Sequence, residues 1–259
     1  MKNLAFFLLA SSALLTTASA APRLVVSTPS LVPESQIDLV LDSPAVAISD
    51  LGKTVANTWM KIQPAMAGKL LWKAQNIATF IPEAAPIIGA TYTFSISGNH
   101  QYLDGAAIPA GKFATIASES FRVTAINAPN RWSSDYSPSI GAWQVVFNDA
   151  VDPATAVNFI SFSSDSDQRV AARLEHPTFA NAGYYVTQSK PWADRFPGNE
   201  PTDPSPENPV PFMLTITPAS PLPPGTGWGV SIFKGLPNQS ATARTTEASH
   251  AEIGEIKPF

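Results

Sequence analysis

The sequence predicts an all-β protein that consists of two tandem Ig-like β-sandwich domains after a signal peptide. Three observations lead to this prediction. Apolar and polar residues alternate with a period of two in many short segments, which is typical of strands that bury one face. Prolines and glycines separate these segments, and no segment of useful length shows a helical period. One stretch of the chain also occurs twice.

The repeat relates residues 78–96 (ATFIPEAAPIIGATYTFSI) to residues 214–232 (LTITPASPLPPGTGWGVSI). The two stretches align without a gap at a constant offset of 136 residues. Corresponding pairs are Pro82 and Pro218, Gly89 and Gly225, Tyr92 and Trp228, and Ile96 and Ile232. The same strand, turn and strand are therefore expected in both halves of the chain.

In the first copy, three segments have the pattern of strands. In residues 37–42 the apolar side chains at 37, 39 and 41 alternate with Asp38, Val40 and Asp42. Residues 78–80 before Pro82 and residues 91–96 alternate apolar and polar side chains. Proline ends that strand because it has no backbone N–H to donate. The expected inward residues are Ile37, Leu39, Leu41, Ala78, Phe80, Tyr92, Phe94 and Ile96.

The second copy repeats this order. The expected inward residues are Trp143, Val145, Phe147, Leu214, Ile216, Trp228, Val230 and Ile232. The expected outward residues are Gln144, Val146, Asn148, Gly227, Gly229 and Ser231. Many short strands with proline and glycine turns at close spacing indicate β-sandwiches.

These patterns divide the chain into four parts. We expect a signal peptide at 1–20, a first sandwich at 21–118, a second sandwich at 119–246, and a tail at 247–259. The tail is polar with a weak strand-like end, and it is interpreted either as a tail or as the truncated start of a further domain. The second sandwich is longer because of residues 190–211 (KPWADRFPGNEPTDPSPENPVP). Its prolines exclude a central strand, so this segment is predicted to be a long surface loop.

The N-terminus has the three parts of a cleavable signal peptide: Lys2, an apolar run at 4–15, and Ala18-Ser19-Ala20. The apolar run is too short to span a hydrocarbon core of about 30 Å. The chain has no cysteine, which excludes disulfides, thiol chemistry and a lipid anchor on an N-terminal cysteine. A periplasmic or secreted protein is therefore expected.

The motifs of the sequence predict no catalytic residue, no cofactor and no metal site, and so no enzyme. The formal net charge of -4 gives no attraction to nucleic acid or to anionic lipid. The three histidines, His100, His176 and His250, lie far apart and are expected on loops or edges. No nucleophile elbow, zinc-protease pair or phosphate-binding glycine loop occurs.

Three weaker signals have a structural and a functional interpretation. Asp165 and Asp167 have a spacing used at calcium sites, but the supporting glycine and glutamate are missing, which favours a polar hairpin tip. The acidic residues of loop 190–211 are a weaker calcium candidate. Asn238-Gln239-Ser240 matches a glycosylation acceptor by pattern.

The tryptophans and acidic residues also leave open a site for sugars. The side chains of Trp59, Trp72, Trp132 and Trp192 either stack on sugar or plug the ends of a sandwich, and the second interpretation is favoured. Paired carboxylates for glycoside hydrolysis remain open too, because such pairs meet in space and not in sequence.

Three segments in a fixed order resemble a known family. They are IDLVLDSPAV (37–46), KIQPAMAGKLLW (61–72) and the first copy of the repeat. This order resembles the bacterial Ig-like module at the N-terminal end of bacterial alpha-2-macroglobulins, which also occurs singly in other envelope proteins. The resemblance covers most of 25–117 and, more weakly, 140–235.

The resemblance implies non-catalytic N-terminal modules of a secreted or periplasmic alpha-2-macroglobulin-like protease inhibitor, in a fragment or truncated form. The partners would then be later domains of a longer chain, or a protease bound through them. The family's thioester motif needs a cysteine, so that chemistry is missing from these residues. The alternative is a free-standing envelope protein that binds a glycan or a protein, through a sheet edge or through loop 190–211.

Overall fold

The computed structural model describes residues 21–128, 142–182, 192–197 and 205–257. Strands dominate, all strand pairs named below are antiparallel, and the helices are single turns. The predicted all-β class is confirmed. The predicted signal peptide at 1–20 and the side chain of Trp132 lie outside the described residues. Within the described residues, no helix is long and apolar enough to cross a membrane.

Residues 23–117 form two sheets, which we call the first sandwich. One sheet has the strand order β1-β2-β6-β5-β3 and the other β4-β7-β8. The strands are β1 (Arg23–Val26), β2 (Ile37–Val40), β3 (Thr54–Ala56), β4 (Met60–Gln63), β5 (Gly68–Ala74), β6 (Ile77–Pro82), β7 (Thr91–Ile96) and β8 (Gly111–Ala117), with a 3-10 turn, η1, at Ile48–Asp50.

Residues 123–256 form the second sandwich. Its strands are β9 (Val123–Asn127), β10 (Trp143–Phe147), β11 (Ile160–Ser163), β12 (Arg169–Glu175), β13 (Met213–Pro218), β14 (Gly225–Ile232) and β15 (Ser249–Ile256). Their order is β15-β14-β11-β12-β13-β10-β9. The start of β12 pairs with β11 and its end pairs with β13, so this strand passes from one layer to the other.

The two sandwiches share one strand order. Apart from β3, the layers β1-β2-β6-β5 and β4-β7-β8 correspond to β9-β10-β13-β12 and β11-β14-β15. With strands lettered A to G along each sandwich, this is the order ABED and CFG of Ig constant-type domains. Strands β6 and β13 have the same bounds at the offset of 136 residues. The sequence repeat thus corresponds to a repeated topology, while the count of two independent domains stays a prediction.

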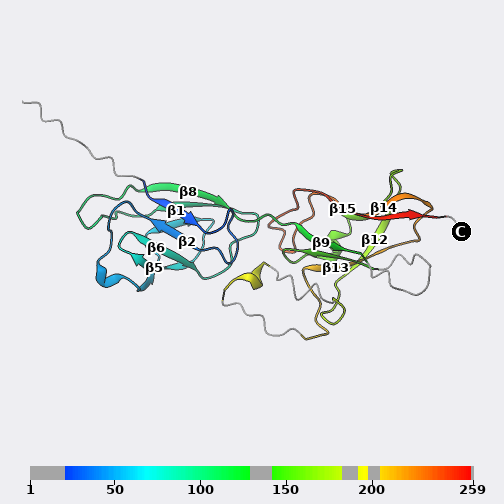
Figure 1. Cartoon of the computed structure of the whole chain (residues 1–259), viewed down its shortest axis with the longest axis horizontal. Helices are drawn as coiled ribbons and strands as arrows, with labels where there is room; N and C mark the ends of the chain where they lie inside the picture. Colours follow the sequence, from blue (N-terminus) through cyan, green and yellow to red (C-terminus); the bar gives the residue numbers. More distant parts are fainter. Residues whose placement is uncertain (1–20, 129–141, 183–191, 198–204, 258–259) are drawn as a thin grey trace, which may run out of the picture.

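The inward residues of both copies are buried as predicted. Tyr92, Phe94 and Ile96 lie in the core of the first sandwich. Trp228, Val230 and Ile232 lie in that of the second. The two cores lie at opposite ends of an elongated molecule, because the sandwiches are arranged end to end (Figure 1).

Four of the residues predicted to face outward in the second copy are in fact buried: Val146, Asn148, Gly229 and Ser231. The connection between β12 and β13 covers Val146 with a small apolar cluster that includes Ala182, Val210 and Phe212. The hydroxyl of Ser231 lies 2.6 Å from that of Ser163 and 2.9 Å from Nδ1 of His250. The outer faces of β10 and β14 are therefore covered, which the alternation of residues did not reveal.

The prediction of a tail at 247–259 also requires correction. Residues Ser249–Ile256 form strand β15, which pairs along β14. Ala251, Ile253 and Ile256 pack against the second core. The second sandwich therefore extends to Ile256.

A tyrosine anchors the turn between β6 and β7. The hydroxyl of Tyr92 accepts a hydrogen bond of 2.7 Å from the backbone N–H of Ile87, five residues upstream. This is the tyrosine corner of Ig-like sandwiches. Trp228 takes the same place in the second copy, and within the described residues its indole N–H has no partner. The corner is thus built with a polar anchor in the first sandwich only.

Replacing Tyr92 by Phe tests this anchor. We expect a loss of about 0.5–1.5 kcal/mol in the free energy of unfolding, measured in urea, because the hydrogen bond disappears. Tyr102→Phe is a matched control, since the hydroxyl of Tyr102 is buried in the same core without a partner among the described residues. Equal losses in both variants would contradict the anchor.

The same variant has a consequence at alkaline pH. Burial raises the pKa of Tyr92 above its usual value of 10.0, although the hydrogen bond from Ile87 acts in the opposite direction. The stability from the neutral phenol is then complete below pH 10 and falls as the pH rises through the raised pKa. Tyr92→Phe should remove that part of the alkaline loss.

Candidate functional site

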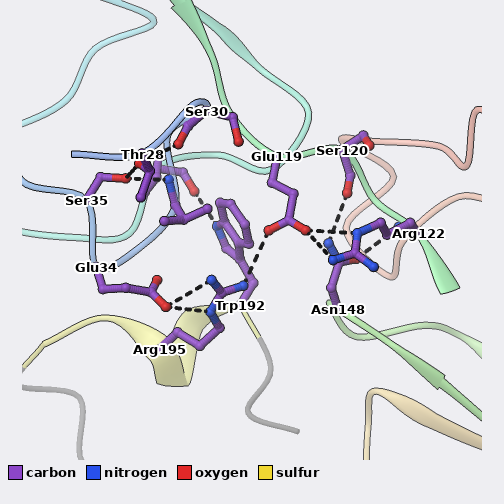
Figure 2. A network of polar contacts seen from close by, with 12 residues as sticks. Thr28, Ser30, Glu34, Ser35, Glu119, Ser120, Arg122, Asn148, Trp192 and Arg195 are labelled. Atoms are coloured by element: carbon purple, nitrogen blue, oxygen red, sulfur yellow. Dashed lines mark hydrogen bonds and ion pairs between the residues drawn. The ribbon is translucent and has the colours of Figure 1, made fainter. Parts of the chain in front are cut away.

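The most elaborate polar site among the described residues joins the two sandwiches (Figure 2). We call it the joint. The first sandwich contributes loop 27–36 and corner 83–90. The second contributes loop 148–159, loop 233–248 and residues 192–197, which belong to the connection between β12 and β13. Linker 118–122 runs between these two groups.

The linker is hydrogen-bonded to the first sandwich. The N–H of Glu119 donates to the carbonyl of Leu31 at 3.0 Å, and the carbonyl of Glu119 accepts from the N–H of Gly89 at 2.8 Å. The hydroxyl of Ser118, which is buried, donates to the carbonyl of Ile87 at 2.6 Å. The linker therefore lies fixed between loop 27–36 and corner 83–90.

Asn148 attaches the linker to the second sandwich. Its side-chain oxygen accepts from the N–H of Arg122 at 2.9 Å, and its Nδ2 donates to the carbonyl of Ser120 at 2.9 Å. Its backbone N–H donates to the carbonyl of Arg122 at 3.2 Å. One buried amide side chain thus holds the linker on both sides of Phe121.

Apolar side chains from both sandwiches meet at the joint. Ile88 of corner 83–90 is 3% exposed and belongs to the core of the second sandwich. Phe121 is fully buried in that core and stacks on Phe147 with ring centroids 5.6 Å apart. Corner 83–90 therefore supplies a side chain to the core of the neighbouring sandwich.

Trp192 connects the second sandwich to corner 83–90 of the first. Its indole Nε1 donates to the carbonyl of Pro86 at 2.6 Å, and this hydrogen bond is buried. Its backbone N–H donates to the carbonyl of Asn148 at 2.9 Å. Since Trp192 is 4% exposed and packs in the second core, it is a plug between sandwiches and not a sugar platform.

Arg195 completes the contact through the 3-10 turn η2 (Ala193–Arg195). Its Nη2 lies 2.9 Å from Oε1 of Glu34, and its Nη1 lies 3.4 Å from Oε2 of Glu119. Arg122 binds the other oxygen of Glu119 at 2.7 Å. The guanidinium of Arg195 also lies over the ring of Trp192, 5.6 Å from its centroid.

A hydrogen-bonded helix cap lies in loop 148–159 of the second sandwich. Asp152 caps helix α1 (Pro153–Ala156), accepting from the N–H groups of Ala154 and Thr155. The pKa of Asp152 is lowered, first by the hydroxyl of Thr155 at 2.6 Å and then by these N–H groups.

Asn238 ties loop 233–248 to loop 148–159. Its Nδ2 donates to Asp149 at 2.9 Å, and its side-chain oxygen accepts from the N–H of Ala243 at 3.0 Å. Asn238 is only 2% exposed. Its amide therefore serves the fold, and attaching a glycan there would break these hydrogen bonds.

The other candidate residues do not gather at one place. Asp165 and Asp167 lie in the hairpin tip between β11 and β12, as the favoured interpretation predicted, with Asp167 at φ 59°. Glu200 and Asp203 lie outside the described residues. Within the described residues, no group of three His, Asp or Glu side chains is placed to hold a metal ion.

The histidines and remaining tryptophans have separate local contacts. His100 stacks on half-buried Trp59 with centroids 4.0 Å apart, and Trp72 is buried beneath. His176 bonds the carbonyl of Met213 at 2.9 Å. The favoured interpretation of Trp72 and Trp192 as core residues is confirmed, and Trp59 is partly buried and packs against the first core.

Sequence reasoning missed the joint. Loop 190–211 was predicted to be a surface loop, yet Trp192 is buried and Arg195 binds the first sandwich. Glu34, Glu119 and Asn148 carried no motif. The signal in the sequence was a tryptophan, Trp192, in a proline-rich loop with Arg195 close by. A large aromatic side chain in a loop indicates that the loop packs on another surface.

Comparisons with known proteins assign no family to this chain. No protein-family model matches the sequence, and no curated protein matches it.

Gly89 offers a direct test of the joint. Its φ is +74°, and an added Cβ would lie 2.9 Å from Cβ of Ala243. Gly52 has the same conformation, with φ +77°, but open space around it. We expect Gly52→Ala to cost about 1–2 kcal/mol for the left-handed backbone. Gly89→Ala should cost about 1–3 kcal/mol more, because it also overpacks the joint.

Urea unfolding of both variants measures the difference. Adding Ala243→Gly to Gly89→Ala should recover most of the excess loss, since it removes the opposing methyl group. Equal losses for the two alanine variants would mean that corner 83–90 does not contact Ala243 tightly in solution.

Proposed function

We propose that this chain is a non-catalytic scaffold, in which two β-sandwiches are held at a fixed angle and serve as N-terminal modules of a secreted or periplasmic alpha-2-macroglobulin-like protease inhibitor. The scaffold role is supported by one observation above all. Among the described residues, the second sandwich uses parts of three connections at one end to hold the first sandwich, and Trp192 and Arg195 of the longest connection are both engaged there.

The chemistry of the joint supports a mechanical role. Its charged groups form ion pairs with one another: Glu34 with Arg195, Arg195 with Glu119, and Glu119 with Arg122. The side chains of Asn148 and Trp192 donate hydrogen bonds to backbone carbonyls. Groups that are satisfied within the protein stabilise one geometry, whereas a catalytic site keeps reactive groups available for a substrate.

The alternative, an envelope protein that binds a partner through loop 190–211, receives less support. Residues 192–197 of that loop face the first sandwich, where Trp192 and Arg195 are engaged. Deleting the loop would therefore disturb the joint in addition to removing a surface. Binding through a sheet edge remains compatible with the strand order, since β1, β3, β4, β8, β9 and β15 are edge strands.

A distance measurement tests the scaffold. The chain has no cysteine, so Lys61→Cys and Lys234→Cys place one spin label on each sandwich. We expect a single narrow distance distribution between the labels. Adding Trp192→Ala and Arg195→Ala should broaden it, because the hydrogen bond of Trp192 to Pro86 and the ion pair of Arg195 with Glu34 are both lost. Lys53→Ala is the control, since it breaks only the ion pair with Asp50, outside the joint.

A broad distribution in the chain with intact Trp192 and Arg195 would overturn the scaffold. The parent protein is tested separately, by reading the coding DNA on the 3′ side of the Phe259 codon. We expect an open frame, or an adjacent gene, that encodes macroglobulin domains with a bait region. A stop codon with no such gene nearby would refute the inhibitor and leave the scaffold untouched.

A further inference from the structure

One aspartate of the chain is followed by glycine. Asp104-Gly105 is the only Asp-Gly pair, and no asparagine precedes a glycine. The backbone nitrogen after an aspartate can attack the side-chain carboxyl carbon of that aspartate, and a side chain on the following residue hinders the attack. Glycine has no side chain and permits the backbone rotation that the attack needs. By its sequence, Asp104 is therefore the aspartate most able to react with its own backbone.

The structure places this pair at an exposed loop tip. Asp104, Gly105 and Ala106 are exposed, and they lie between Tyr102 and Ile108, which are buried in the first core. Gly105 has a φ of +87°, and a Cβ added to it would meet no atom of the described residues within 4 Å. Neighbouring atoms therefore do not obstruct a change of shape at Gly105. Exposed loop tips of this kind are also where a chain tolerates chemical change best.

The side chain of Asp104 is folded onto the backbone that follows it. Its Oδ1 accepts a hydrogen bond of 2.9 Å from the N–H of Ala106. The ring of atoms closed by this bond contains the carboxyl carbon of Asp104 and the backbone nitrogen of Gly105, so the two reacting atoms are held near each other. One contact opposes the attack, since the N–H of Gly105 donates to the carbonyl of Tyr102 at 3.0 Å. This bond lies at the exposed tip, where local opening costs least.

We propose that Asp104 is a site of spontaneous modification, at which its carboxyl and the nitrogen of Gly105 form a cyclic imide that opens to isoaspartate. The nitrogen attacks the neutral side-chain carboxyl, a C–N bond forms, and the carboxyl hydroxyl leaves with the amide proton as water. Water then adds to one of the two imide carbonyls and breaks its bond to nitrogen. Breaking the bond at the side-chain carbonyl restores aspartate. Breaking the bond at the main-chain carbonyl leaves a chain that runs through the side chain.

The modification lengthens the tip by one backbone atom. The N–H of Tyr102 donates to the carbonyl of Ala106 at 2.9 Å, which closes the tip. The N–H of Leu103 donates to the carbonyl of Pro44 at 2.8 Å, which ties the tip to the neighbouring loop of the first sandwich. A longer tip changes the geometry of both hydrogen bonds. The tip follows β7 and precedes β8, whereas the joint lies at the other ends of these strands, so the change stays away from the joint.

Incubation of the purified chain in neutral buffer at physiological temperature tests the site. We expect isoaspartate to accumulate at Asp104, where a protease that cuts before aspartate then no longer cuts, and where an isoaspartyl methyltransferase adds a methyl group. The rate should exceed that at Asp165 several-fold. Asp165 is a matched control, because it is also exposed at a hairpin tip but is followed by Ser166, and its carboxyl packs on Gly227. Equal rates at the two aspartates would overturn the proposal.

Two variants and a peptide separate this reaction from other damage. Asp104→Glu should give no product, because its longer side chain would have to close a larger ring. Asp104→Asn should react several-fold faster, because a neutral amide is attacked more readily than an ionised carboxylate. A synthetic peptide of residues 99–109 gives the rate without the fold. Conversion in the peptide but not in the folded chain would also overturn the proposal, since the bond from Gly105 to Tyr102 would then protect the site. These outcomes do not depend on the proposed function, which concerns the joint.

Discussion

The insertion of corner 83–90 into the end of the second sandwich is the contact on which the arrangement of the molecule depends. Burying a side chain such as Ile88 contributes about 1.5–3 kcal/mol. A buried hydrogen bond such as that from Trp192 to Pro86 adds about 0.5–1.5 kcal/mol net. Each half-exposed ion pair of Arg195 adds about 0–1 kcal/mol. Packing therefore provides most of the stabilisation, and the charges fix the orientation in which it occurs.

The long connection between β12 and β13 serves two surfaces at once. Its end covers the outer face of β10 with Val210 and Phe212, and its middle carries Trp192 and Arg195 to the first sandwich. A loop inserted in one sandwich has thus become part of the contact with the other. Such a use fits the general position of loops, which vary in length while the strands that hold them stay constant.

Burial could be predicted for residues whose inward or outward direction follows from the alternation along a single strand. Tyr92, Phe94 and Trp228 were expected in the core because alternation assigns one face of a strand to the inside. Val146 and Ser231 were wrongly expected to be exposed, because alternation along a strand does not show whether its outer face is covered by other parts of the chain. The strand at Ser249–Ile256 was missed because its glutamates and glycine hide a pattern that only pairing with β14 supplies. The joint depends on residues far apart in the chain, such as Glu34 and Arg195, and none of them has a motif.

Trp192 and Pro86 are 106 residues apart in sequence, which has a consequence for the order of folding. Contacts between distant residues form late, because the chain between them must first be ordered. Domains near the N-terminus generally fold first during synthesis. The first sandwich would then present Ile88 and the carbonyl of Pro86 to water until the last strands of the second have formed. In this interval the corner would be an exposed apolar surface, which assembly of the joint then covers.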